Sequence, residues 1–491
     1  MRELEHAPHA PALTESMRSV GYSLESAIAD LIDNSISAGA KNIRVRFSPY
    51  GEPFVAIIDD GCGMNDKELV LAMRHGSQNP KETRSANDLG RFGLGMKTAS
   101  LSQCRQLTVV SLKRGQLSAA RWDLDVVART EKWTLLLLDR PEIAALPLVE
   151  ILSSQDSGTM ILWSRLDRLI AGENSVESSL GEGMVRVREH LALVFHRFLF
   201  EEGHFDHLNI SINENPITAL DPFLISHKAT QRLPEERIRI EDSTVLVQPY
   251  ILPHYSKLAP NELKLAGGEE GLRRQQGFYV YRNRRLIIWG TWFRLARQEE
   301  LSKLARVRVD MTNALDHLWV LDIKKSVAYP PQEVRQNLKR IVERIAEGSR
   351  RVYTFRGRRS NDDRSVHIWD RIEDRNGICY RINRDHPIVT SIEGRLDDED
   401  LGLWRSVLKQ LDEMLPVEVV YADMGADRRH VRQRPDYTLE DLTDLADKLL
   451  DACGMNRTLR SNLLSGLNNI EPFSLYPDMT EAIIARLQNG R

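Results

Sequence analysis

Residues 27–40, AIADLIDNSISAGA, decide the fold of the first part of the chain. Apolar residues recur in this stretch and just before it with the spacing of one helix face, and the set comprises Leu24, Ala27, Ile28, Leu31 and Ile32. Ser23 is suited to cap the start of the helix, and Gly39 is suited to end it. The pattern therefore predicts a core-packed helix over about residues 23–38.

Two acidic residues and an amide interrupt this apolar helix. Asp30 and Asn34 stand four residues apart, so they lie one turn apart at the edge of the apolar stripe and point at one spot. Taken alone, the pair could simply solvate the border of the helix. Asp33 lies further round the polar face, and we interpret it as a solvated or structural carboxylate. Other segments must decide between solvation and a binding site.

Composition limits the class of protein. The chain has 491 residues, 42% hydrophobic and 28% charged, which fits a globular protein of about three domains. It shows no apolar run of membrane-spanning length and no signal peptide, and its four cysteines lack metal-ligand spacing. We therefore expect a cytoplasmic protein without a membrane partner. The formal net charge of −3 excludes a uniformly basic nucleic-acid binder but leaves local basic surfaces open.

Changes of pattern along the chain predict an α+β protein with three domains. A layered helix-and-sheet domain is expected over residues 1–203, and a second mixed unit over residues 204–346, beginning with the strand LNISIN. Residues 347–491 follow as a mostly helical domain of unknown role.

Two glycine-rich motifs stand close together in the first domain. DDGCGMN, residues 59–65, follows a buried strand and combines a carboxylate with two glycines that let backbone approach a ligand, although an acidic turn has the same composition. GRFGLGMKTAS, residues 90–100, leads glycines and a lysine into a helix, a pattern typical of phosphate loops and also of flexible loops. It has neither the context of a dinucleotide fingerprint nor the ending of a P-loop.

The order of these motifs, completed by SGTMILW at residues 157–163, resembles the GHKL ATPase superfamily of gyrase, heat-shock chaperone, histidine kinase and MutL. The resemblance covers about residues 20–165 and is nearest to prokaryotic MORC-like and MutL-like ATPases. It implies a Bergerat-type ATP-binding α/β sandwich, an S5-like transducer domain, and ATP and Mg²⁺ as cofactors. RHGS at residues 74–77 also resembles the segment before the MutL lid.

The resemblance assigns roles to individual residues. Asp30 would orient or deprotonate the attacking water, Asn34 would coordinate Mg²⁺, and Asp59 would bind the exocyclic amine of adenine with support from Thr159. The other residues assigned to the nucleotide are Gly61, Gly63 and Met64 near the base, and Gly90, Gly93, Leu94, Gly95, Met96, Lys97 and Thr98 around the phosphates. One departure stands out, because hydrolytic relatives usually carry glutamate where this chain has Asp30.

The second domain resembles the transducer of MORC-type and MutL-type ATPases in GFYVYRNRRLI (277–287), ARVRVDM (305–311) and LDHLWVLDIKKS (315–326). In these relatives a transducer lysine reaches the γ-phosphate. Lys324 and Lys325 both fit that catalytic role, and the sequence does not distinguish between them. A solvated strand end is the alternative interpretation of this pair.

The resemblance implies an Mg-dependent ATPase, converting ATP and water to ADP and phosphate, that closes as a homodimer on ATP. We expect sequence-nonspecific action on DNA, in antiviral defence with partner proteins from a defence operon; a chaperone-like clamp and a nucleotide-sensing scaffold are the alternatives. A histidine kinase is disfavoured because only about 20 residues precede the first motif. The basic residues that indicate DNA are Arg273, Arg274, Arg282, Arg284, Arg285, Arg294, Arg297, Arg350, Arg351, Arg356, Arg358 and Arg359.

Overall fold

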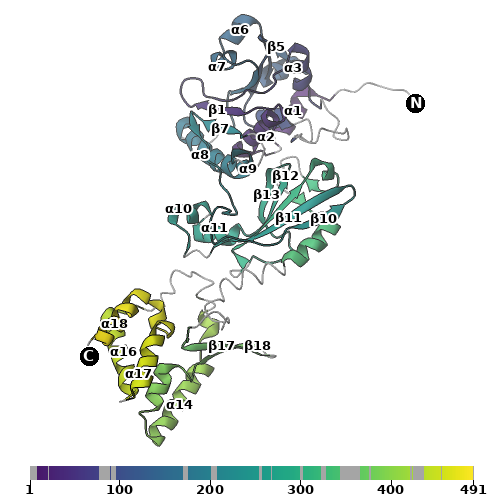
Figure 1. Cartoon of the computed structure of the whole chain (residues 1–491). Helices are drawn as coiled ribbons and strands as arrows, with labels where there is room; N and C mark the ends of the chain where they lie inside the picture. Colours follow the sequence, from purple (N-terminus) through teal and green to yellow (C-terminus); the bar gives the residue numbers. More distant parts are fainter. Residues whose placement is uncertain are drawn as a thin grey trace. The chain divides into compact units, whose positions relative to one another are not determined.

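The computed structural model divides the chain into two compact units, residues 1–350 and residues 351–491 (Figure 1). It describes residues 8–19, 21–76, 89, 95–169, 175–200, 207–253, 257–266, 268–298, 302–321, 328–342, 365–374, 377–420, 423, 436–454 and 456–489. The α+β class predicted from the sequence is confirmed, and the second unit is mostly helical.

The first sheet of unit 1 contains eight described strands in the order β5-β4-β3-β6-β2-β1-β7-β8. Neighbouring strands are antiparallel except β1 and β7, which are parallel. The strands are β1 (Asn42–Ser48), β2 (Phe54–Asp59), β3 (Gln106–Lys113), β4 (Gln116–Asp123), β5 (Leu136–Leu137), β6 (Gly158–Ser164), β7 (Asn209–Ile212) and β8 (Asn215–Pro216). The helices are α1 (Ala10–Arg18), α2 (Leu24–Ser37), α3 (Asp66–Met73), α4 (Gly95–Leu101), α5 (Leu124–Thr130), α6 (Arg140–Ala144), α7 (Val149–Ser153), α8 (Val176–Val194) and α9 (His196–Leu199).

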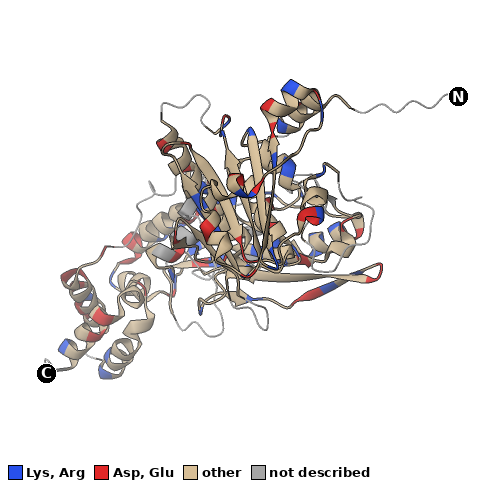
Figure 2. Ribbon diagram, turned by 90° about the horizontal axis from the view of Figure 1, so that it is seen from above, with Lys and Arg blue, Asp and Glu red and all other residues tan. Residues whose placement is uncertain are grey.

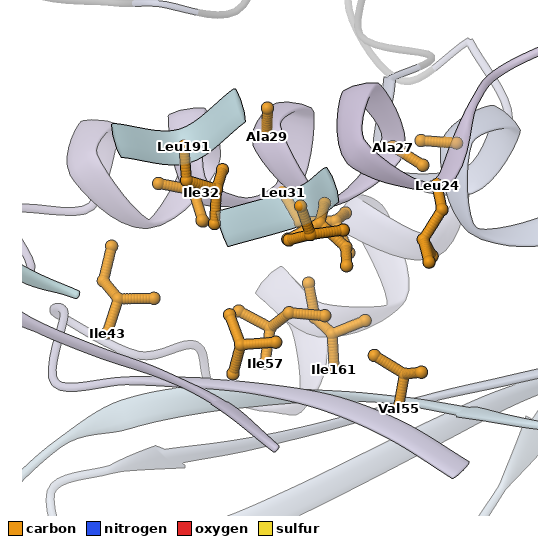
Figure 3. Packing of buried hydrophobic residues seen from close by; sticks show 14 of the residues in the cluster. Leu24, Ala27, Ala29, Leu31, Ile32, Ile43, Val55, Ile57, Ile161 and Leu191 are labelled. Carbon is orange, nitrogen blue, oxygen red and sulfur yellow. The ribbon is translucent and has the colours of Figure 1, made fainter. Parts of the chain in front are cut away.

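Helix α2 forms where the apolar periodicity predicts it. The Ser23 hydroxyl accepts from the Ser26 amide as an N-cap, and Gly39 follows the helix at φ +78. Figure 3 shows Leu31 and Ile32 of α2 facing Ile57 and Ile161 of the sheet. Helix α8 packs beside α2. The core of unit 1 thus fixes the helix that carries Asp30 and Asn34.

A second sheet follows in unit 1, with strands in the order β10-β11-β14-β12-β13 and β9 paired with β11. Its strands are β9 (Gln231–Arg232), β10 (Glu236–Ile240), β11 (Ser243–Ile251), β12 (Gly277–Arg282), β13 (Arg285–Thr291) and β14 (Ala305–Met311). Around it lie α10 (Pro260–Leu265), α11 (Gly268–Arg274), the short pair β15 (Val320–Leu321) and β16 (Ala328–Tyr329), and helical residues 332–342. The segment GFYVYRNRRLII, whose pattern predicts one strand, instead forms the hairpin β12–β13, because Asn283 and Arg284 take positive φ values and turn the chain.

Unit 2 combines a two-stranded sheet with helices. Its elements are β17 (Trp369–Asp374), β18 (Gly377–Ile382), α13 (Pro387–Glu393), α14 (Asp398–Glu413), α16 (Leu439–Ala452), α17 (Arg457–Gly466) and α18 (Pro477–Asn489). Leu442, Ala446 and Phe473 are fully buried in one of its two apolar clusters. Unit 2 thus has apolar cores of its own.

One strand differs from the sequence prediction. LNISIN, placed at the start of the second domain, forms β7, which pairs with β1 of the first sheet from Asn42↔Asn209 to Val45↔Ile212. The physical reason is that β1 would otherwise be an edge strand, whose unpaired backbone groups β7 satisfies. The first sheet therefore continues beyond residue 203. Further boundaries of the three predicted domains stay predictions.

Candidate functional site

Helix α2 positions the two residues predicted to act on water and metal. The Asp30 side chain is 7% exposed, and its Oδ2 accepts a hydrogen bond of 2.9 Å from the Tyr22 hydroxyl. Asn34 lies one turn later and is exposed, so its carboxamide is open to solvent. An exposed amide oxygen suits Mg²⁺, which keeps most of its water ligands and takes few from protein. The structure thus places a held carboxylate and an open amide on one helix.

Asp59 lies at the end of β2 with its carboxylate buried. Three donors reach it: the Ser35 hydroxyl to Oδ2 at 2.7 Å, and the amides of Gly61 at 2.9 Å and Thr159 at 3.2 Å to Oδ1. Burial raises the pKa of Asp59 above its ordinary value, while these donors oppose that shift. Two carboxylate oxygens offer about four acceptor positions, so an amine could still donate to Asp59. The carboxylate thus fits recognition of an adenine amino group.

The two glycines after Asp59 are required by close packing. Gly63 has φ +62, and a Cβ there would lie 2.0 Å from the Leu112 carbonyl oxygen on β3. A Cβ on Gly61 would lie 2.9 Å from the Ala38 Cβ. Both glycines therefore let the loop after β2 lie directly against its neighbours.

Ser111 of β3 connects the loop to β6. Its hydroxyl accepts from the Met64 amide at 2.8 Å and lies 2.9 Å from the Thr159 hydroxyl. Thr159 thus reaches Asp59 through its backbone amide, while its side chain holds Ser111. Met64 itself is half-buried and packs against the core of unit 1.

The start of α4 contains four of the predicted phosphate-loop residues. A Cβ on Gly95 would lie 3.7 Å from Asp30 Oδ2, so the structure brings these two residues together. Lys97 is buried, and its Nζ donates to the Ala72 carbonyl oxygen at 2.8 Å; burial lowers its pKa to about 8. Met96 is half-buried and Thr98 is buried. Five predicted residues lie outside the described part of the chain: Gly90, Gly93, Leu94, Lys324 and Lys325.

Asp33 is buried, with 1% of its side chain exposed, so it is not solvated. Its Oδ1 accepts from Arg285 Nε at 2.9 Å, and Arg285 belongs to β13 of the second sheet. The hairpin therefore contacts α2 next to Asp30, the predicted general base, and Asn34, the predicted Mg²⁺ ligand. Asp30, Arg285 and His190 line one cavity of ≈ 490 Å³ between α2, α8 and β13.

Three arginines assigned to a DNA surface make contacts inside unit 1. Arg282 is buried and pairs with Asp316, and Arg285 is buried and pairs with Asp33. Arg284 is half-buried, donates to the Arg197 carbonyl oxygen and lies 4.8 Å from the Phe198 ring centre. The prediction is therefore wrong for Arg282 and Arg285, because packing against neighbouring segments, invisible in a linear pattern, removes both from solvent.

Four arginines of the second sheet region are exposed: Arg273, Arg274, Arg294 and Arg297. Gln298 donates to the carbonyl oxygens of Arg274 and Gly290, so the segments that carry these arginines adjoin. Elsewhere, acidic and basic positions are interspersed along the ribbon (Figure 2). Arg350, Arg351, Arg356, Arg358 and Arg359 lie outside the described residues.

Sequence reasoning missed Tyr22, Ser35 and Ser111 as supports of the site. Ser35 carried a signal, because it is a polar residue within the helix that packs against the core, and it is 2% exposed. Tyr22 and Ser111 carried none, since only the fold brings them to Asp30 and Thr159.

The comparisons with known proteins concern mainly the first part of the chain. Residues 22–159 match the family described as "Histidine kinase-, DNA gyrase B-, and HSP90-like ATPase". These residues therefore form a GHKL-type ATPase domain.

Similar curated proteins include the DNA mismatch repair protein MutL of Thermoanaerobacter sp. (strain X514), 36% identical over 94 residues, which are 19% of this chain and 15% of that protein. MutL of Buchnera aphidicola subsp. Acyrthosiphon pisum (strain Tuc7) is 34% identical over 116 residues, 23% of this chain and 20% of that protein. The matches thus span a fifth or less of these relatives. The "Crystal Structure of N terminal domain of a DNA repair protein" aligns over 69% of this chain and 98% of that one, with 13% identity and a TM-score of 0.43.

Two kinds of feature are absent from the described residues. None of their helices combines the length and apolar character needed to cross a membrane. Nor does the described part of the chain gather three or more His, Cys, Asp or Glu side chains in a metal-holding arrangement.

Proposed function

We propose that this protein is an Mg²⁺-dependent ATPase that closes as a homodimer on ATP and acts on DNA. One observation carries the proposal: the single helix α2 carries Asp30 and Asn34 one turn apart and also Ser35, whose hydroxyl donates to Asp59. A helix fixed by a packed core keeps such groups at constant separation, as catalysis requires. The GHKL-type domain over residues 22–159 supports ATP as the nucleotide.

Each residue has a distinct task in this proposal. Asp59 accepts the adenine amine, and its buried position excludes competing water. Asp30, held by Tyr22, orients the attacking water and accepts its proton as general base. Asn34 holds Mg²⁺, which would neutralise phosphate charge. Because aspartate is shorter than glutamate by one carbon–carbon bond of about 1.5 Å, Asp30 acts at shorter reach, and slow turnover is expected.

Action on DNA is supported by the names of the similar proteins, which are DNA mismatch repair proteins, and by the adjoining exposed arginines around Arg274. Arginines without an identified groove-reading helix favour contacts with the DNA backbone, hence binding without sequence preference. A role in antiviral defence, with partner proteins from a defence operon, belongs to the same proposal. A chaperone-like clamp and a nucleotide-sensing scaffold are its alternatives.

The test measures ATP turnover and nucleotide affinity, with and without DNA. Asp30→Asn should lower turnover by about 10²–10⁴-fold, the usual contribution of a general base, and leave ATP affinity nearly unchanged. Asp59→Ala should abolish nucleotide binding. Normal turnover by Asp30→Asn would refute the role of Asp30, and undiminished ATP affinity of Asp59→Ala would refute that of Asp59. Stimulation of ATP turnover by DNA supports a clamp on DNA over a clamp on protein clients. A parent protein that binds ATP without hydrolysing it indicates a nucleotide-sensing scaffold.

A further inference from the structure

The turn of the β12–β13 hairpin presents two arginines to the ATP-binding region of unit 1. Arg282 ends β12 and Arg285 begins β13, and the two are directly paired across the hairpin. Asn283 and Arg284 form the turn, with φ of 48 and 70. A two-residue turn with both φ values positive matches the twist of the paired strands. The two arginines are therefore fixed relative to each other.

Arg285 reaches the helix that carries the predicted catalytic residues. Its Nε donates to Asp33 Oδ1 at 2.9 Å, and the side chains are 8% and 1% exposed. Its guanidinium also lies 4.5 Å from the ring centre of Phe195. A buried charge left without its partner is strongly unfavourable, so this pair constrains where the hairpin and α2 can lie. Asp33 stands between Asp30 and Asn34 in the same turn of α2.

Arg282 reaches a second part of the ATP-binding region. Its Nη1 donates to the Leu89 carbonyl oxygen at 2.9 Å, and its Nε and Nη2 donate to the two Asp316 carboxylate oxygens at 2.7 and 2.6 Å. The Leu89 amide in turn donates to the Ser37 hydroxyl at 3.2 Å. Leu89 directly precedes the motif GRFGLGMKTAS. The hairpin and α2 thus hold the same residue from two sides.

The hairpin also contacts α9, so a displacement of the hairpin would act on several neighbouring segments. Tyr281, next to Arg282, places its hydroxyl 2.7 Å from His196 Nε2, and Arg284 of the turn donates to the Arg197 carbonyl oxygen. Residues 286–289 of β13 also line the cavity into which Asp30 opens. A shift of this hairpin would therefore move Asp33, Leu89 and the wall beside Asp30 together.

We propose that this hairpin couples the second sheet to ATP hydrolysis, with Asp33 and Arg285 as positioning residues. The proposal rests on the ATPase function proposed above and deepens it. Arg285 holds α2 through Asp33 and so sets the place of Asp30, while Arg282 holds Leu89. Neither arginine touches the reacting atoms in this scheme. Their charges act through α2 and through the backbone of Leu89.

The test compares Asp33→Asn, Arg285→Gln and the double variant with the parent full-length chain. We expect kcat to fall by about tenfold, within the range of measured couplings between sites, and ADP affinity to stay within about twofold. The double variant removes both buried charges, so it should recover thermal stability relative to the single variants while its kcat stays low. A merely structural pair would instead recover stability and kcat together.

The control is the pair Arg384–Asp412 of unit 2, in which Arg384 Nη2 lies 2.6 Å from Asp412 Oδ2. Arg384→Gln and Asp412→Asn remove an ion pair from outside the hairpin and α2, so kcat should stay within about twofold of the parent. Unchanged kcat in the Asp33 and Arg285 variants, or an equal loss in the control variants, would overturn the coupling. A parent that neither binds nor hydrolyses ATP would refute the ATPase function itself, which is a different outcome.

Discussion

Replacing Ser35 by alanine tests how the buried Asp59 carboxylate is held. The Ser35 hydroxyl donates to Asp59 Oδ2 at 2.7 Å, with the two residues 2% and 5% exposed. A hydrogen bond to a charged group contributes about 1.5–3 kcal/mol to stability. The variant should therefore lose about that much free energy of unfolding at neutral pH, and Kd for ATP and for ADP should rise together by roughly tenfold, since 1.4 kcal/mol corresponds to a factor of ten.

The pH dependence of this loss follows from the direction of the pKa shift. Burial raises the folded-state pKa of Asp59, so the folded state binds the proton more tightly than the unfolded chain, and Asp59 favours folding most below its unfolded pKa of 3.8. That contribution is lost as pH rises through the folded pKa. Because Ser35 lowers this pKa, Ser35→Ala should raise it further. The stability difference between variant and parent should accordingly shrink on acidification.

Two measurements check the prediction: urea unfolding from neutral to acidic pH, and titration with fluorescent ATP and ADP analogues. Ser153→Ala is the matched control, because Ser153 also donates from a helix but to the Val149 carbonyl oxygen, away from the site. Equal affinities of the Ser35 variant and the parent would refute the role of Ser35 in holding the adenine-binding carboxylate. A loss for ATP without a loss for ADP would instead assign the effect to the γ-phosphate.

Three further predictions concern the switch, the DNA surface and acid stability. One of Lys324 and Lys325 should be the residue that contacts the γ-phosphate. Its replacement by alanine should impair ATP hydrolysis and the dimerisation caused by a non-hydrolysable ATP analogue, while ADP affinity is kept. A double variant that sediments and hydrolyses ATP like the parent would exclude both lysines from this role. The four exposed arginines to be replaced by glutamine are Arg273, Arg274, Arg294 and Arg297. The combined variant should have a smaller slope of log K for DNA binding against log salt concentration, by about 0.9 for each phosphate that is no longer neutralised. An unchanged slope would place the DNA surface elsewhere. Burial lowers the pKa of His196 from 6.5 to about 3. Between these two pH values the unfolded chain binds a proton at this residue and the folded chain does not. The free energy of unfolding should therefore fall by up to about 1.4 kcal/mol for each unit by which the pH falls. In urea unfolding at pH 7, 6 and 5, His196→Gln should lack that slope, and an identical slope would contradict it.

Local signals in the sequence were sufficient for α2 and for the class of domain. The N-cap at Ser23 and the end at Gly39 depend on neighbours a few residues away, so their spacing alone predicts them. The order of the glycine motifs carries the resemblance to GHKL ATPases, and the family match over residues 22–159 confirms that resemblance. The hairpin β12–β13 was not predicted, because the pattern of GFYVYRNRRLII indicates a single strand and the turn at Asn283 and Arg284 is visible only in the structure.

Only the tertiary structure decided the environment of the charged residues. An aspartate in solvent and one in a buried pair look alike in sequence, and Asp33 is buried because Arg285, 252 residues away, packs onto α2. Ser35 likewise donates to Asp59, which is 24 residues away in the sequence, and β7 pairs with β1, although most of the first sheet lies between them in the sequence. The sequence by itself determined which residues form the helix and the glycine loops, since those depend on local spacing. Which charges are paired, buried or exposed depends on contacts between residues that are distant in the sequence, so only the tertiary structure of unit 1 decides it.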